Sequence, residues 1–175
     1  DLPSASYANG TVASGKTNGL AIGNAANSGS NQSIAIGYFS EATAPEVTPA
    51  ALPATAVGAG AKAKGYSTVA LGLSAAAEAD SATALGSKTS ATGDRTVAVG
   101  SDANATGRYA SAFGADASAV GNATAVGANS LASVDAAVAV GTDSKATGNY
   151  ASALGGGATA SNNDATAFGH GTVAS

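Results

Sequence analysis

The chain has 175 residues, of which 45% are hydrophobic and 10% are charged, and its formal net charge is −4. Because it contains no Cys, Met or Trp, Ala carries most of the apolar share, and a core built from Ala must be thin. The acidic balance argues against nucleic-acid binding, the lack of Cys excludes thiolate chemistry, and no apolar run reaches the ~20 residues of a membrane span.

The first predicted element is a half-repeat, ASG at 13–15, after which a triplet of Ala, a bulky apolar residue and Gly recurs along the chain. Eight of the ten spacings between its glycines are 14 residues. These glycines are Gly23, Gly37, Gly58, Gly72, Gly86, Gly100, Gly114, Gly127, Gly141, Gly155 and Gly169. Such a period fits two strands of about five residues and two tight turns, whereas a helical repeat needs roughly 30 residues or more. The sequence therefore predicts an all-β fold of about eleven stacked 14-residue coils.

Two irregularities interrupt the repeat. Between Gly37 and Gly58 the spacing rises to 21 residues, with the seven extra residues in the Pro-rich stretch 41–53. Proline cannot donate to a strand ladder, so we expect a loop that leaves the coils here. Loops on rigid scaffolds commonly bind ligands, although the pattern slightly favours an inert excursion, because loop length costs little. The candidate ligand-binding residues of this loop are Glu41, Pro45, Glu46, Pro49 and Pro53. The spacing before Gly127 is 13 residues, which predicts the loss of one turn residue.

Alternation within the first strand of each coil separates small from bulky residues. The positions two and four before each Gly hold small residues, and those one and three before it are mostly bulkier. We expect the small side chains to line a thin interior and the bulky ones to form an outward stripe through which the chains associate. The stripe residues are Ile22, Ile36, Val57, Leu71, Leu85, Val99, Phe113, Val126, Val140, Leu154 and Phe168. The reverse assignment, with the bulky side chains inside a monomeric solenoid, remains open at this point. In the second strand, Lys62, Lys64 and Lys145 indicate a face in water.

The strings SIAIG at 33–37, STVALG at 67–72 and TVAVG at 96–100 alternate with ATG half-repeats. Over about residues 13–175 this pattern resembles the head repeats of trimeric autotransporter adhesins, the YadA-like family. The resemblance implies a left-handed parallel β-roll with three chains packed side by side as a homotrimer. It also implies attachment to host cells, through an extracellular-matrix protein or a cell-surface receptor.

The same resemblance places the chain at the bacterial cell surface, anchored in the outer membrane through a C-terminal region that is not in this chain. No neck motif, heptad pattern or membrane-anchor strand occurs in the sequence. We therefore expect residues 1–175 to be a head without stalk or anchor, with no membrane insertion of its own.

Catalytic constellations are absent from the sequence. His170 is the only His, so no metal site or catalytic triad can be assembled around it, and no phosphate-loop motif occurs. We expect no catalysis, no metal and no cofactor. Scattered acidic residues such as Asp102 and Asp116 favour turns, and Tyr109 and Tyr150, which share one repeat position, are expected to pack in a turn stack. An alternative function, a monomeric ice-binding-like solenoid, needs a continuous Thr array, whereas the Thr positions here are interrupted.

Overall fold

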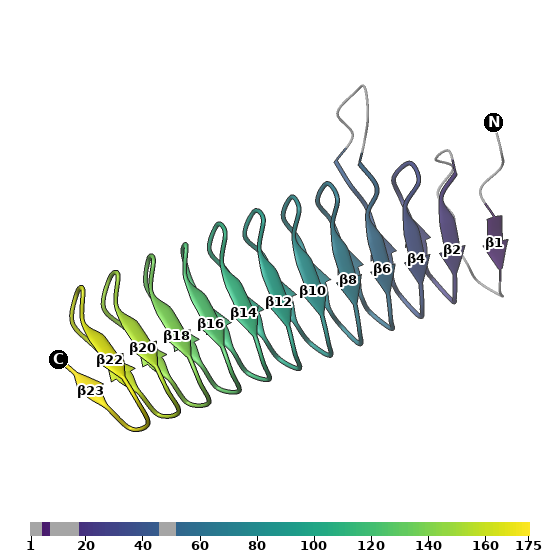
Figure 1. The fold of residues 1–175 in the computed structure, drawn as a ribbon. Coiled ribbons are helices and arrows are strands. Elements are labelled where there is room, and N and C mark those ends of the chain that lie inside the picture. Colours follow the sequence, from purple (N-terminus) through teal and green to yellow (C-terminus); the bar gives the residue numbers. More distant parts are fainter. Residues whose placement is uncertain (1–4, 8–17, 46–51) are drawn as a thin grey trace. The chain divides into compact units, whose positions relative to one another are not determined.

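The computed structural model describes residues 5–7, 18–45 and 52–175, and the chain forms two compact units, Asp1–Thr89 and Ser90–Ser175. Each unit is a parallel β-solenoid in which each coil from residue 18 onward contributes one three-residue and one two-residue strand (Figure 1). The longer strands stack into one sheet, called here the long-strand sheet, and the shorter strands stack into the short-strand sheet. The half-repeat predicted at 13–15 lies outside the described residues.

In the first unit, the long-strand sheet comprises β1 (Ala5–Tyr7), β2 (Leu20–Ile22), β4 (Ile34–Ile36), β6 (Thr55–Val57), β8 (Val69–Leu71) and β10 (Thr83–Leu85). Its short-strand sheet comprises β3 (Asn27–Ser28), β5 (Glu41–Ala42), β7 (Lys62–Ala63) and β9 (Ala76–Ala77). All pairings are parallel, and equivalent repeat positions lie beside each other, as in Ala35↔Ala56.

In the second unit, the long-strand sheet comprises β12 (Val97–Val99), β14 (Ser111–Phe113), β16 (Thr124–Val126), β18 (Val138–Val140), β20 (Ser152–Leu154) and β22 (Thr166–Phe168). Its short-strand sheet comprises β11 (Ser90–Ala91), β13 (Asn104–Ala105), β15 (Ser118–Ala119), β17 (Leu131–Ala132), β19 (Lys145–Ala146), β21 (Thr159–Ala160) and β23 (Val173–Ala174). The predicted stack of β-coils is confirmed, but the predicted strands of about five residues were too long, because turns occupy the remaining positions of each coil.

The interior of each unit is built almost entirely from alanine. Ala of the long strands, such as Ala98 and Ala139, and Ala of the short strands, such as Ala105, are completely buried. The largest fully buried side chains are Thr and Ser. The small residues therefore line a thin core, as predicted, and the reverse assignment with the bulky side chains inside is wrong. Two sheets can approach this closely because Ala adds only one carbon beyond the backbone.

Each coil turns at two corners. The first corner follows the long strand and starts at the repeating Gly, for example Gly127, whose φ of 127° is open to Gly and strained for other residues. A Cβ placed on Gly127 would lie 2.6 Å from the carbonyl oxygen of Gly141 in the next coil. The repeating Gly is thus required both by the backbone conformation and by the close approach of stacked coils.

Both corners also contain a left-handed residue two positions after the corner starts. At first corners this is often Asp or Asn, as at Asp102 and Asn129, which tolerate the conformation well. Buried Ser and Thr then close the corner, since Ser144 Oγ donates a 2.8 Å hydrogen bond to the Gly141 carbonyl, and Thr96 Oγ1 donates one of 2.6 Å to Gly93 at a second corner. These bonds satisfy hydroxyl groups that would otherwise be buried without a partner.

The 13-residue coil is shortened at its second corner, as predicted. The strand β15 is followed by Val120, Gly121 and Asn122 before the buried Ala123, one residue fewer than in neighbouring coils. Gly121 adopts the left-handed conformation with a φ of 70° and completes the shorter turn. The in-register pairing of β14 with β16 is preserved.

Candidate functional site

The predicted stripe forms the outer face of the long-strand sheet. In the first unit, in-register pairing joins its members from coil to coil, as in Ile22↔Ile36 and Ile36↔Val57. In the second unit, Val126↔Val140 and Val140↔Leu154 continue the same arrangement. Every stripe residue is half-buried or exposed, and none belongs to the alanine core. The stripe residues predicted from the sequence are thus brought together in one column within each unit.

A second column lies beside the stripe on the same outer face, three positions before each repeating Gly. It consists of apolar residues, Ser and Thr, and no charged residue occupies either column. The members of this second column are Leu20, Ile34, Thr55, Val69, Thr83, Val97, Ser111, Thr124, Val138, Ser152 and Thr166. The outer face of the long-strand sheet is therefore uncharged in both units and combines an apolar stripe with a mixed column of apolar and hydroxyl side chains, which is compatible with a face that contacts protein.

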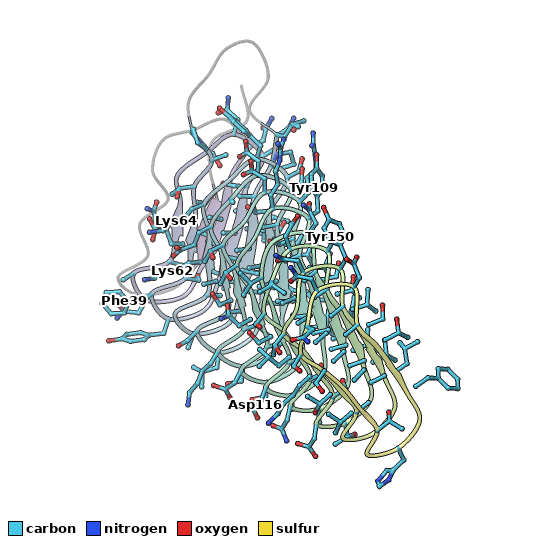
Figure 2. All side chains as sticks on the ribbon, turned by 90° about the vertical axis from the view of Figure 1, so that its left-hand side faces the viewer. Phe39, Lys62, Lys64, Tyr109, Asp116 and Tyr150 are labelled. Carbon is cyan, nitrogen blue, oxygen red and sulfur yellow. The ribbon has the colours of Figure 1, made fainter. Side chains whose placement is uncertain are left out.

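The outer face of the short-strand sheet has the opposite character. In the first unit, Lys64 Nζ lies 3.3 Å from Glu41 Oε2, and Lys62 is exposed beside them; Figure 2 shows Lys62 and Lys64 on one side of the ribbon. In the second unit, Lys145 of β19 is likewise exposed, and the equivalent position holds Leu131 in β17 and Val173 in β23, so this face is mixed there. A partly exposed ion pair of this kind contributes little to stability. Because the lysines of this face are exposed, we regard it as the solvated side of each unit.

The Pro-rich insertion begins later than predicted. Glu41 is not a loop residue, because it lies in β5 and pairs in register with Lys62 of β7. Its position is fixed by its neighbour Ala42, which enters the core like the alanines of other short strands. Pro45 and Pro53 are exposed at the two ends of the insertion. The other two predicted loop residues, Glu46 and Pro49, lie outside the described residues.

One exposed aromatic pair was not predicted from the sequence. Tyr38 and Phe39 occupy a first corner of the first unit, with ring centroids 4.5 Å apart in an edge-to-face arrangement. Both rings are exposed, and Phe39 has a positive φ of 53°. Figure 2 shows the Phe39 side chain on the outside of the ribbon. The pair could have been noticed in the sequence, because Tyr38 and Phe39 are the only two adjacent aromatic residues of an aromatic-poor chain.

The predicted turn stack of Tyr109 and Tyr150 is wrong, because three coils separate them. Tyr109 instead contacts two arginines at second corners of the second unit. Arg95 Nη1 donates a 2.7 Å hydrogen bond to the Tyr109 hydroxyl. The guanidinium carbons of Arg95 and Arg108 lie 5.5 Å and 5.1 Å from the centroid of the Tyr109 ring. Two cations thus share the ring of one exposed tyrosine.

The described part of the chain holds no group of three or more His, Cys, Asp or Glu side chains that could bind a metal ion. It also holds no helix that could cross a membrane. On the outer face of the short-strand sheet, the Thr position that includes Thr92 and Thr106 is interrupted by Lys64, Glu78 and Val120 in other coils. This face therefore lacks the flat Thr array that an ice-binding surface needs.

Short in-register coils, an alanine core and an uncharged apolar outer face define a parallel β-solenoid of the repeat-protein class. The family model of the YadA head domain repeat matches residues 14–40, 53–75, 63–89, 77–103, 91–117, 105–122, 121–144 and 146–172. The chain belongs to this family.

Comparison with solved structures supports the same assignment. The crystal structure of the collagen-binding domain of the Yersinia adhesin YadA matches with a TM-score of 0.59 and 27% sequence identity, over 78% of this chain and 74% of that one. No curated protein matches the sequence. The resemblance identified from the repeat strings is thus confirmed.

Proposed function

We propose that this chain is the adhesive head of a bacterial surface protein, which assembles as a homotrimer and attaches to host cells or extracellular matrix. The observation that carries the proposal is the uncharged apolar outer face of the long-strand sheet, in a chain built from YadA head repeats. In this proposal an outer-membrane anchor in a C-terminal region outside these 175 residues holds the head at the cell surface. The role is one of binding, without catalysis, metal or cofactor.

The exposed stripe favours association of several copies. Fully burying a Val, Leu, Ile or Phe side chain stabilises a structure by roughly 1.5–3 kcal/mol, and each unit repeats such a residue in every coil. A column of this length left in water exceeds the apolar patches that monomers usually carry. We therefore propose that the outer face of the long-strand sheet faces the axis of the trimer. The number of three chains is taken over from the family resemblance.

For the ligand, we propose an extracellular-matrix protein, with collagen as the first candidate. The related Yersinia domain is described as collagen-binding, and 27% identity over most of both chains supports testing the same ligand here. Three identical chains would present every surface site three times. Such multivalency raises overall affinity for a repetitive matrix without any new contact.

Two measurements test the proposal. Light scattering on the purified chain should give about three times the chain mass of 16.1 kDa. A solid-phase assay should show saturable binding to immobilised collagen, compared with fibronectin, laminin and an albumin-coated control. A monomeric mass at micromolar concentration would overturn the trimer, and a trimer that binds none of the matrix proteins or host cells would overturn the adhesive role.

A further inference from the structure

Charged side chains gather at both edges of the second unit, with opposite sign. Two consecutive first corners carry Asp102 and Asp116, both exposed. Two consecutive second corners carry Arg95 and Arg108, also exposed, and Asp94 is exposed beside Arg95 at the first of them. The two arginines contact Tyr109. Figure 2 shows Tyr109 and Asp116 at opposite edges of the ribbon. Over these coils the first corners are acidic, and the second corners keep a net positive charge because Asp94 offsets only one of the two arginines.

The arginines have no carboxylate partner within their own unit. Among the described residues, the pair formed by Lys64 and Glu41 is the one ion pair within 4.0 Å. Arg95 and Arg108 instead converge on the Tyr109 ring and remain in contact with solvent. Asp94 offsets one of the two positive charges and the two arginines still repel each other, so a further anionic partner at this edge would be favourable.

The two edges cannot neutralise each other within one chain. Asp102 follows Arg95 by one half-coil, and the strand between the corners separates them by on the order of 15 Å at ~3.3 Å per residue. This distance exceeds the screening length of about 8 Å at physiological ionic strength. A strong interaction between these carboxylates and guanidinium groups must therefore come from another copy of the chain.

Three-fold packing would bring the two edges together. If the outer faces of three long-strand sheets surround one axis, the units form the sides of a triangle. Because rotation about the axis preserves chain direction, each vertex joins the first corners of one chain to the second corners of the next, in a heterologous contact that closes after three copies. Rotation also keeps equivalent coils of the three chains at the same height.

The heights of the opposite charges match in this arrangement. Stacked coils rise by ~4.8 Å, and a first corner lies half a coil, about 2.4 Å, from the second corners before and after it. Asp102 falls between Arg95 and Arg108 in the chain, and Asp116 follows Arg108 by the next half-coil. Each carboxylate is thus level with at least one guanidinium group of the neighbouring chain.

We infer that Asp102 and Asp116 of one chain pair with Arg95 and Arg108 of the next at all three vertices of the assembly. This inference rests on the proposed trimer and adds a second contact to its apolar face. Tyr109 acts as a positioning residue, because its hydroxyl and ring hold the guanidinium groups. We favour a second copy of the chain as the partner, because its carboxylates would lie at the same height as these guanidinium groups at each vertex.

The complementarity is confined to these coils. Further along, Asp135 and Asp143 would lie at similar heights on opposite edges, where they repel. Each accepts a hydrogen bond from an Asn of its own chain, with Asn122 Nδ2 at 2.7 Å from Asp135 Oδ1 and Asn129 Nδ2 at 3.2 Å from Asp143 Oδ1. The attraction between chains is therefore expected at Arg95 and Arg108 alone.

Charge reversal tests the pairing in the full chain. The variant Arg95→Asp/Arg108→Asp places acids opposite acids at every vertex, and Asp102→Arg/Asp116→Arg places bases opposite bases. Each should raise the trimer dissociation constant at least tenfold, measured by analytical ultracentrifugation at low salt. Combining all four reversals in one chain should restore the constant to within about threefold of the original. Lys145→Asp on the solvated face is the matched control, and it should leave assembly unchanged.

Cross-linking supplies an independent readout, because the chain contains no Cys. Asp102→Cys/Arg108→Cys places one thiol on each edge, and a short bis-maleimide should yield a covalent trimer on a denaturing gel. Either single Cys variant should yield no trimer. Because the two edges of one chain are too far apart for internal linkage, a covalent trimer reports the proposed vertex directly.

The outcomes separate the inference from the function on which it rests. A monomeric parent chain would refute the proposed trimer itself. A trimeric parent whose stability is the same in all charge variants would refute the vertex pairing alone. The pairing is also refuted if Arg95→Gln/Arg108→Gln leaves the trimer unchanged but abolishes retention on a heparin column, because the cluster would then be a site for an acidic polysaccharide.

Discussion

Phe113 and Phe168 occupy the same repeat position in the second unit, yet Phe113 is 40% exposed and Phe168 is 79% exposed. Phe113 lies between Val99 and Val126 of the two strands that pair with β14, whereas β22 pairs with a strand on one side only. Stacking thus removes about half of the solvent contact of a stripe side chain. The remaining exposed surface is what a neighbouring chain would cover.

The first prediction concerns this stripe. Phe113→Asp should prevent trimer formation, because an unpaired carboxylate would lie in a desolvated contact at a cost of several kcal/mol, about 3 or more. Val126→Asp, one coil away, should have the same effect. Light scattering should report the single-chain mass of 16.1 kDa for both variants.

The matched control for the stripe is Lys145→Ala on the outer face of the short-strand sheet. It should leave the trimer mass unchanged, because Lys145 is exposed on the opposite side of the core. Circular dichroism of the Asp variants should retain the β-sheet signal, since the mutated side chains point away from the alanine core. Trimeric, normally folded Asp variants would show that the stripe does not lie between chains.

A second prediction compares two glycines with left-handed backbones. Gly127→Ala should destabilise the fold by about 3 kcal/mol or more, because its Cβ would lie 2.6 Å from the Gly141 carbonyl carbon and oxygen. Gly171 has a φ of 64° and open space around its Cβ position, so Gly171→Ala should cost only ~1 kcal/mol. Urea unfolding measures both, and equal losses would contradict the close approach of stacked corners.

The thinness of the core can be tested with a larger side chain. Ala139→Leu should destabilise the second unit by roughly 1–3 kcal/mol or more, because Ala139 has no exposed surface and faces the other sheet. The control is Ala76→Leu on the outer face of the short-strand sheet, where Leu131 already occupies the equivalent position. That variant should change the thermal midpoint by only a few degrees. A tolerated Ala139→Leu would mean that the core has room that the structure does not show.

The last prediction concerns the Pro-rich insertion. Replacing residues 45–53 by the pair Asp-Ser, which forms the second corner at Asp80 and Ser81, should restore a 14-residue coil. The trimer mass and thermal midpoint should stay nearly unchanged, because loop length itself costs little. If matrix binding also persists undiminished, the insertion is not the ligand site. Loss of binding with an intact trimer would assign the site to this loop.

Repeated columns explain how much of this structure could be predicted. The stripe and the alanine core were recognisable because each position recurs in every coil, so a single sequence supplies many independent examples. Strand lengths were overestimated because the left-handed corner residues include Phe39 and Arg95, which carry no local preference for that conformation. Their turn geometry follows from their place in the coil and not from their chemistry.

The charged cluster illustrates a different limit. Arg95 and Tyr109 are 14 residues apart and thus become neighbours when the coils stack, whereas a search for local motifs treats them as unrelated. Glu41 was assigned to the insertion on composition, although its alignment with Lys62 one coil later would have placed it in β5. Contacts between coils become predictable only when the sequence is compared with itself at the repeat spacing.

The direction of the hydrogen bonds has a mechanical consequence. In both sheets of each unit, bonds such as Gly114 N–H to the Val99 carbonyl, at 2.8 Å, connect one coil to the next and run along the stacking direction. Force along that direction would load the hydrogen bonds of a single coil boundary in tension, whereas force parallel to the strands would load many bonds in shear. We expect such a unit to yield by peeling one coil at a time under an axial pull. Each small step would dissipate work while the remaining coils kept their folded surfaces.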